Sequence, residues 1–185
     1  MTTNLPDPAQ TLMSPGRPYE VAAIFLMQKY CGPTMERTLH WWRDTWVTWR
    51  GSHWQELTRS SLRAQLYHFT ALATYVDAQG NMKMWAPTEK KISDLAGALA
   101  SLCELSDKID APCWLDGRTT GTVVAFTNGL LDIASRQLYP HTPQFFNLHG
   151  VPFAYDAAAA EPEHWFAFLD SVWPPPSDTM SSHPA

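Results

Sequence analysis

The sequence predicts an α+β fold, with a helical N-terminal half and a strand-rich C-terminal half. Apolar residues recur at helical spacing in three stretches before about residue 105. Beyond Asp110, proline, glycine and polar turns divide the chain into short pieces that are typical of strands. Helices and strands are segregated and do not alternate, which argues against a parallel α/β sheet. With 185 residues, 45% of them hydrophobic, the chain is long enough to bury a core.

The first element predicted along the chain is a flexible arm. Residues 1–17 carry three prolines and no periodic pattern. From Pro18 to about Tyr30 the apolar spacing predicts a helix, and proline suits the first position of a helix. Gly32-Pro33 ends this helix, because proline disfavours helical backbone in the residue before it and glycine is a common stop.

A β-hairpin rich in tryptophan is predicted next. Two aromatic and β-branched runs, Trp46–Trp49 and His53–Leu57, flank Arg50-Gly51-Ser52 and place Gly51 in the turn. Because side chains alternate along a strand, neighbouring indoles should point to opposite faces. We therefore expect most of the indoles to pack inside the fold and only one or two to remain free to stack.

Two more helices follow in the pattern of apolar residues. Thr58 can cap a helix whose helical spacing continues as far as Val76, and the turn-forming residues 77–81 would close it. A further helix is expected from Thr88 to about Leu105. The residues on its apolar face would be Ile92, Leu95, Leu99 and Leu102.

The C-terminal half predicts short strands. Val123–Phe126 should form one strand, and residues 130–133 and 137–139 should form a hairpin. Asn128-Gly129 is expected to make a tight turn into that hairpin. The side chains expected to be partly buried there are Leu131, Leu138 and Tyr139.

A short helix is expected from about Pro162 to Val172. Its aromatic side, with Trp165, Phe166 and Leu169, should face inward and pack against the preceding hairpin. The segment 174–185 is rich in proline and serine, so we expect a disordered tail. Residues 18–173 are therefore predicted to form one domain.

The sequence lacks the motifs of several classes of catalytic site. The nine glycines show no P-loop spacing, so we expect no ATP hydrolysis by this chain alone. Acidic residues are scattered rather than paired on a strand to hold divalent metals. Histidines and cysteines lack zinc-ligand spacing, and no Gly-x-Ser-x-Gly sequence occurs. We therefore predict no catalytic residues, no metal site and no cofactor.

Charge is distributed unevenly behind the net charge of −5. Residues 29–91 hold nine Lys or Arg against five acids, whereas residues 92–185 hold three against eleven. Such a split allows one basic face, and aromatic rings beside cations can stack unpaired bases. The alternative is that the indoles pack and the lysines belong to a solvated surface. The candidate DNA-binding residues are Arg43, Trp49, Arg50, Lys83, Lys90 and Lys91.

The sequence also bears on location. No apolar run reaches 18 residues, so a membrane span is not expected. The N-terminal segment is polar and rich in proline, which argues against a secretory signal. Three widely spaced cysteines indicate reduced, buried thiols, and together these features predict a cytoplasmic protein.

Residues 128–174 carry a recognisable pattern. Asn128-Gly129 precedes an apolar pair and Asp132, then Leu-Tyr-Pro-His follows, and farther along come Trp165 and Trp173-Pro174. This stretch resembles the region just upstream of the ATPase core in phage and plasmid primase-helicases. Those are superfamily-3 helicases with the poxvirus-type N-terminal domain. The resemblance extends upstream through Trp41-Trp42-Arg43 and covers roughly residues 18–174.

The resemblance implies an accessory, non-catalytic module of DNA replication from a phage, prophage or plasmid-like element. In that family the corresponding domain is thought to form a collar that helps subunits assemble and guides DNA. The implied partners are single-stranded DNA, helicase or primase subunits and further copies of the chain.

Two other classes of function stay open. The chain could be a protein-interaction module or a truncated prophage remnant that pairs with, or inhibits, a full-length helicase. A third reading is a small-ligand-binding protein with the tryptophan cluster as its pocket.

Overall fold

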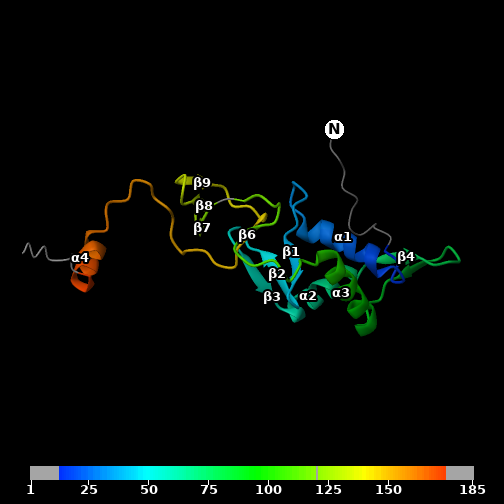
Figure 1. Cartoon of the computed structure of the whole chain (residues 1–185). Helices are drawn as coiled ribbons and strands as arrows, with labels where there is room; N and C mark the ends of the chain where they lie inside the picture. The colour runs from blue at the N-terminus through cyan, green and yellow to red at the C-terminus, as the bar shows by residue number, and fades with distance from the viewer. Residues whose placement is uncertain (1–12, 120, 174–185) are drawn as a thin grey trace, which may run out of the picture. The chain divides into compact units, whose positions relative to one another are not determined.

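The computed structural model describes residues 13–119 and 121–173 and divides the chain into two compact units, Met1–Tyr155 and Asp156–Ala185. The expected arm and tail lie mostly outside the described residues. Met13, near the end of the expected arm, is buried and donates its backbone N–H to the carbonyl oxygen of Thr74. The described residues form four helices and ten short strands, which confirms the mixed α+β fold (Figure 1).

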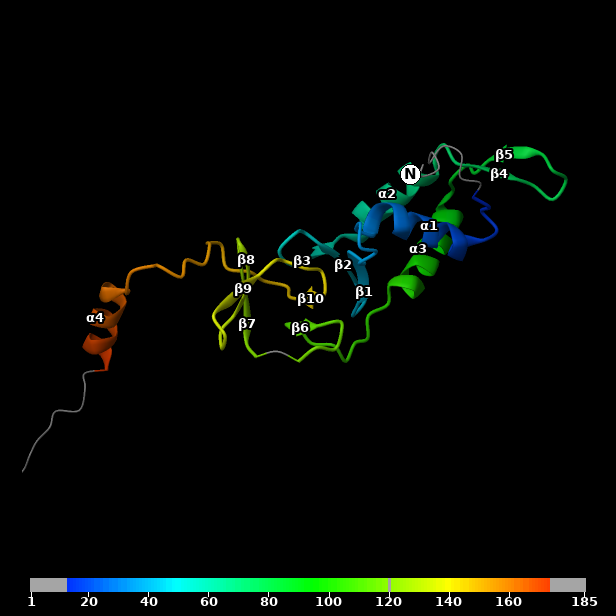
Figure 2. The same cartoon turned by 90° about the horizontal axis from the view of Figure 1, so that it is seen from above.

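Three of the helices lie together in the first unit, as Figures 1 and 2 show: α1 (Pro18–Tyr30), α2 (Arg59–Thr70) and α3 (Glu89–Cys103). A proline opens α1, and the hydroxyls of Thr58 and Thr88 accept backbone N–H groups at the starts of α2 and α3. The sides of the helices that face one another form the main core, with Val21, Phe25, Leu66, Leu95 and Leu99 fully buried.

The second helix is shorter than its apolar spacing predicted, because α2 ends at Thr70 and does not continue to Val76. The next residues form strand β4 (Thr74–Val76), which pairs with β5 (Met82–Met84). β-Branched and aromatic residues favour extended backbone. The carboxylate of Asp77 accepts two backbone N–H groups of the turn between the strands. The predicted turn cluster is therefore the tip of a hairpin.

A three-stranded antiparallel sheet adjoins the helices in the order β1-β2-β3. Its strands are β1 (Leu39–Trp42), β2 (Thr45–Trp49) and β3 (Trp54–Leu57). β2 and β3 form the predicted tryptophan hairpin, and Gly51 occupies the turn with a φ of 91°. β1 was not predicted as a strand. It owes its extended form to pairing with β2, which places Trp41 opposite Trp46.

This sheet separates two hydrophobic clusters, because side chains alternate between its faces. The face toward the helices contributes Leu39, Trp41, Trp46 and Leu57 to the main core. The opposite face packs with residues 105–115 and 146–148 in a second cluster, to which it contributes Trp42, Val47, Trp49 and Trp54. Since both faces are covered, the sheet is the central layer of the first unit.

The other strands of this unit include the three predicted in the C-terminal half. β7 (Val123–Phe126), β8 (Gly129–Asp132) and β9 (Gln137–Tyr139) form one sheet, and β6 (Cys113–Trp114) pairs with β10 (Phe145–Phe146). Thr127 and Asn128 make the turn from β7 to β8. Leu131 is buried as expected. Leu138 and Tyr139 are exposed, contrary to expectation, because they lie on an edge strand.

The second unit contains the predicted C-terminal helix, α4 (Glu163–Val172). No residue of α4 is buried, so the expectation that its aromatic side faces inward is wrong. Trp165 and Phe166 are exposed, and Leu169 is half-buried. The apolar spacing that predicted an inward face is present in α4. None of the helices in the described part of the chain is long and apolar enough to cross a membrane.

Candidate nucleic-acid interface

The five tryptophans between residues 41 and 54 all contribute to the packing of the sheet. Trp46 and Trp54 are buried, and the other three are half-buried. The ring centres of Trp41 and Trp46 lie 4.9 Å apart, and those of Trp49 and Trp54 lie 5.9 Å apart. These indoles therefore belong mainly to the hydrophobic core. Only part of the Trp49 ring is accessible for stacking on a base.

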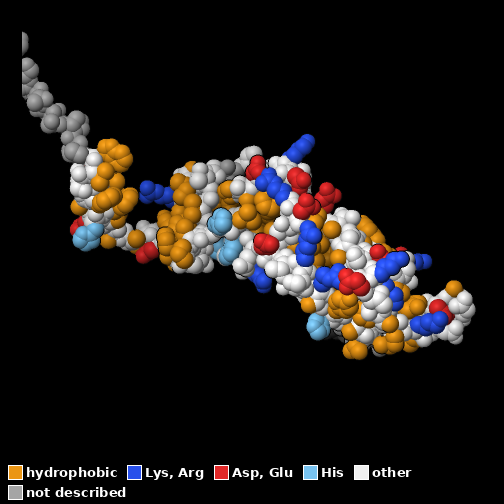
Figure 3. Space-filling view, turned by 90° about the horizontal axis from the view of Figure 1, so that it is seen from below, with side chains coloured by type: hydrophobic (Ala, Val, Ile, Leu, Met, Phe, Trp, Pro, Cys, Tyr) orange, Lys and Arg blue, Asp and Glu red, His pale blue; other side chains and the backbone are white. Residues whose placement is uncertain are grey.

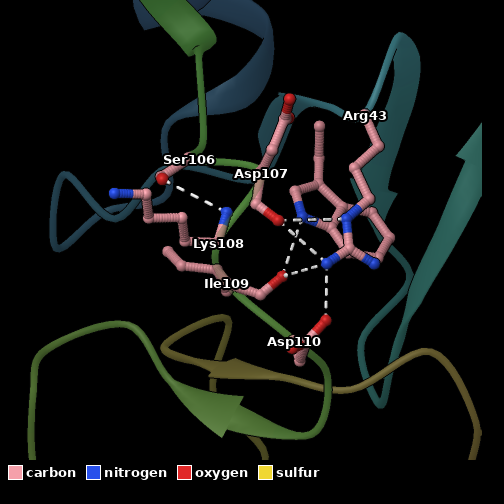
Figure 4. A network of polar contacts seen from close by, with 7 residues as sticks. Arg43, Ser106, Asp107, Lys108, Ile109 and Asp110 are labelled. Carbon is pink, nitrogen blue, oxygen red and sulfur yellow. Dashed lines mark hydrogen bonds and ion pairs between the residues drawn. The ribbon is translucent and has the colours of Figure 1, made fainter.

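Arg43 lies in the turn between β1 and β2, and its side chain holds the segment that follows α3 (Figure 4). The guanidinium donates to the carbonyl oxygen of Asp107 at 2.9 Å and forms an ion pair with Asp110. It also lies over the ring of Trp42, 4.5 Å from the centroid. The indole N–H of Trp42 donates to the carbonyl oxygen of Ile109 at 3.1 Å. Arg43 therefore fastens this segment to the sheet.

Two of the three candidate lysines have partners within the protein. The ammonium of Lys91 donates to the carbonyl oxygens of Trp85 at 2.6 Å and Ala86 at 3.0 Å. Lys83 forms an ion pair with Asp77 at 2.9 Å, on the β4–β5 hairpin. Lys90, in the first turn of α3, is exposed to solvent. A helix N-terminus adds positive potential, so Lys90 is the lysine best placed for a phosphate.

The turn between β2 and β3 presents a second exposed cation, Arg50. Its backbone N–H donates to the carbonyl oxygen of His53 at 2.9 Å, which closes the turn. The imidazole of His53 lies 3.0 Å from the hydroxyl of Ser52. Arg50 itself is exposed, so its guanidinium can approach a phosphate backbone from solvent.

An open groove of about 480 Å³ begins beside this turn, on the sheet face that carries the second cluster. The polar and aromatic residues that line it include Trp42, Arg43, His53, Gln55, Glu56 and His149. Indole and imidazole rings can stack on a base, and amide and imidazole groups can hydrogen-bond to a base edge. The groove therefore offers groups suited to one unpaired base, while Glu56 disfavours a phosphate there.

The sequence did not reveal this groove, because one of its walls comes from a distant segment. The carbonyl oxygen of Asn147 accepts the backbone N–H of Trp54 at 2.8 Å, which brings residues 147–149 to β3. The amide of Asn147 donates to the carbonyl oxygen of His149 at 2.9 Å and orders that segment. His149 lies 96 residues beyond His53 in the chain, so no local pattern links the two.

The residues of the C-terminal pattern have structural contacts. The side chain of Asn128 bonds to both backbone groups of Tyr155, at 2.9 Å and 2.8 Å, and holds the end of the first unit. Asp132 accepts two backbone N–H groups in the turn that follows β8. At Gly129, an added Cβ would lie 2.5 Å from the carbonyl oxygen of Tyr139. Trp165 and Trp173 lie in the second unit, and both are exposed.

Titratable groups near the sheet do not form a reactive site. Burial lowers the pKa of His40 to about 4, so its ring is neutral at pH 7. Burial also raises the pKa of the Cys103 thiol to about 12, which keeps it protonated and unreactive. All three cysteines are free. Among the residues that the structure describes, no group of three or more His, Cys, Asp and Glu is arranged to hold a metal ion.

Positive charge does not gather into one large patch on the face shown in Figure 3. Lys and Arg side chains there are dispersed, and most lie beside Asp or Glu. Charges of both signs weaken long-range attraction to a polyanion. Two of the six candidate DNA contacts, Arg50 and Lys90, are exposed cations. Within the described part of the chain, neither side chain forms a hydrogen bond or an ion pair that the structure records.

Comparison with known proteins gives one finding. A family model described as D5 N terminal like matches residues 26–174, most of the chain. That stretch includes both the β1-β2-β3 sheet and α4. No curated protein matches this chain.

Proposed function

Because the chain belongs to the D5 N-terminal-like family, the N-terminal domain of phage and plasmid primase-helicases, we propose that it is an accessory module of DNA replication. In this role it binds single-stranded DNA weakly and helps subunits of a superfamily-3 helicase to assemble. The observation that carries this proposal is the match over residues 26–174. It spans the layer that carries Arg50 and the groove.

The DNA surface that we propose is centred on the turn between β2 and β3. Arg50 meets the phosphate backbone, and one unpaired base enters the groove between the side chains of His53 and His149. Lys90 adds a second phosphate contact at the start of α3. Arg43 and Lys91 contribute positive potential while they remain bound to carbonyl oxygens of the protein.

Binding through so few cations has a defined signature. Each neutralised phosphate releases counterions, so affinity should fall as salt rises, with a slope set by the number of contacts. Two or three contacts imply a shallow slope and a dissociation constant on the order of tens of micromolar or weaker. Base preference should be small, because stacking depends little on base identity.

The test is a fluorescence anisotropy titration of an unstructured oligonucleotide at low salt. The parent chain is compared with Arg50→Glu/Lys90→Glu. Both changed side chains are exposed, so the fold should persist. The matched control is Lys108→Glu/Arg136→Glu, which makes the same change in net charge at exposed positions elsewhere. Arg43 and Lys91 are left intact because their substitution would disturb the fold itself.

We expect the first variant to lose binding by at least about tenfold, or 1.4 kcal/mol, and the control to lose clearly less. Equal losses would show that net charge, and not this surface, governs binding. A parent chain that fails to bind at low salt would overturn the DNA-binding part of the proposal.

The second candidate function is a protein-interaction module that pairs with a helicase subunit and lacks a DNA role. The exposed aromatic side of α4 favours it, because uncovered apolar surface of this kind marks contact sites for proteins. Association with other chains by a protein that binds no DNA would place this function ahead.

A further inference from the structure

An apolar hollow of about 370 Å³ lies beside β7, outside the groove described above. Its walls include Val123 and Ala125 of β7, Phe145 of β10, and Val151. We call this space the β7 hollow. Its volume lies at the lower end of the range for sites that bind small ligands, which are also lined mainly by apolar groups.

The β7 hollow adjoins the groove that holds the proposed base site. Leu148 and His149 line both spaces, so this short segment is the wall between them. His149 is exposed to solvent. Because aromatic rings in a binding groove can stack on unpaired bases, His149 is placed to contact a base on either side of the wall.

The wall is fixed at both ends by backbone hydrogen bonds. At one end, the carbonyl oxygen of Asn147 accepts the N–H of Trp54 in β3 at 2.8 Å. At the other end, the N–H of Val151 donates to the carbonyl oxygen of Ala125 in β7 at 2.8 Å. A wall that is already ordered reduces the entropy that a ligand loses on binding, so the two spaces are prepared together.

Asn147 brings an unsatisfied hydrogen-bond acceptor to the lining of the β7 hollow. Its Nδ2 donates to the carbonyl oxygens of His149 at 2.9 Å and Ser52 at 3.4 Å. Both partners are acceptors, so the amide cannot be reversed and Oδ1 stays an acceptor. Asn147 is only 3% exposed, and no donor among the described residues reaches Oδ1. Since a buried acceptor without a partner is costly, the hollow favours a ligand that carries an N–H group.

We propose that the β7 hollow binds a second unpaired base of the same DNA strand, next to the base in the groove, with His149 between the two. This inference rests on the DNA-binding role stated above and adds a second base site to it. The apolar walls cover the faces of the base, and an N–H group on its edge donates to Asn147 Oδ1. Every DNA base carries such a group, so the site requires no particular sequence.

The lining of the hollow favours a base over an apolar side chain of a partner protein. Such a side chain would fit the apolar walls but would leave Asn147 Oδ1 without a donor. A base satisfies the walls and the acceptor together. The shared wall also means that a strand with one base in the groove presents its next base at the hollow.

Two adjoining base sites have a consequence for affinity. Once the first base is bound, the second binds from the same strand at a high effective concentration. DNA with neighbouring bases should therefore bind more tightly than DNA in which every base is isolated from the next.

The experiment is a fluorescence anisotropy titration at low salt with two short deoxythymidine oligomers of equal length. One oligomer is complete, and in the other every second base is replaced by an abasic sugar. The second oligomer has the same phosphates, but it can fill only one of the two adjoining sites at a time.

The variant Val123→Met/Val151→Met narrows the hollow from two walls, because methionine is larger than valine and fills irregular gaps. The matched control is Val76→Met/Ile133→Met, which makes similar changes at exposed positions outside the hollow. Thermal melts establish that both variants are folded.

We expect the parent and the control to bind the complete oligomer about five- to tenfold more tightly than the abasic one, in line with the stacking of one more base. The narrowed variant should bind both oligomers alike, at the affinity that the parent has for the abasic one. A folded narrowed variant that keeps the preference of the parent overturns the proposal.

A measurement on the parent chain alone avoids the effect of substitutions on folding. In nitrogen-15 nuclear magnetic resonance spectra, the complete oligomer should shift the backbone amide signals of Gly150 and Val151, which line the hollow. The amide of Gly97, on the exposed side of α3, should not shift. Unshifted signals of Gly150 and Val151 at saturating DNA overturn the proposal, even if the narrowed variant does not fold.

The two oligomers also separate failure of this inference from failure of DNA binding. A parent chain that binds both with equal affinity uses one base site, which overturns the inference and leaves the proposed function in place. A parent chain that binds neither oligomer overturns the DNA-binding part of the proposed function and this inference with it.

Discussion

The residues that the sequence predicted as DNA contacts differ in whether their side chains already have hydrogen-bond or ion-pair partners within the protein. The acceptors of Arg43 lie 64 to 67 residues farther along the chain. No local pattern could therefore show that its guanidinium is engaged. Lys91 has acceptors only five and six residues away, but the loop geometry that brings them close is not readable from composition. Arg50 and Lys90 are exposed, and their assignment as DNA contacts stays a prediction.

His40 supplies a prediction at this scale. Burial lowers its pKa from 6.5 to about 4 in the folded chain. The unfolded chain therefore binds more protons between these values, and stability should fall as pH drops from about 6.5 toward 4. The full loss should be on the order of 3 kcal/mol. Above about pH 6.5 the ring is neutral in both states and this contribution is complete.

The measurement is urea unfolding of the parent and of His40→Gln at pH 7.0, 5.5 and 4.5. Glutamine cannot take up a proton, so the variant should lose most of the slope in this range. Carboxylates of ordinary pKa contribute mainly below this range. An unchanged slope in the variant would show that another group titrates there.

Elements whose residues carry their own signal were predicted well. α1, α3 and the hairpin of β2 and β3 follow from apolar spacing, a proline, a capping threonine and a glycine in a turn. β1 and β4 were missed or misassigned because pairing with another strand, and not local propensity, makes them extended. Helical spacing up to Val76 was present in the sequence, yet the contacts of β5 outweighed it.

Gly129, at the start of β8, gives a testable prediction about the packing of β8 against β9. Its φ is 155°, and a Cβ there would lie 2.5 Å from the Tyr139 carbonyl oxygen and 2.9 Å from Leu138 Cγ. Gly129→Ala should therefore push β8 from β9 and cost about 1–3 kcal/mol. The control is Gly97→Ala on the exposed side of α3, where a Cβ would meet nothing within 4 Å. That change should stabilise by about 0.5–1 kcal/mol. Thermal melts of both variants would show opposite shifts, and equal melting temperatures would contradict the close approach at Gly129.

Contacts between distant segments determine which aromatic residues are buried in the core. The sequence was least informative about these contacts. Composition predicted a buried core, but local apolarity does not indicate which tryptophan is buried. The exposed Trp165 lies in the more apolar run, His-Trp-Phe-Ala-Phe-Leu, and the buried Trp54 lies in Ser-His-Trp-Gln-Glu-Leu. Trp54 is buried because β3 lies between the helices and the segment around Phe146, a contact between residues far apart in the chain. The groove beside it depends on the same contact and so could not be predicted either.

Trp54 and Trp165 therefore provide the prediction for the whole molecule. Trp54 is fully buried, and truncation of a buried tryptophan leaves a cavity, so Trp54→Ala should cost about 3–5 kcal/mol. Trp165 is 55% exposed, so Trp165→Ala should change the free energy of unfolding by less than about 1 kcal/mol. Urea unfolding followed by far-ultraviolet circular dichroism compares the two at a protein concentration low enough to keep the chain monomeric. A large cost for Trp165→Ala in the monomer would mean that α4 is covered within a single copy.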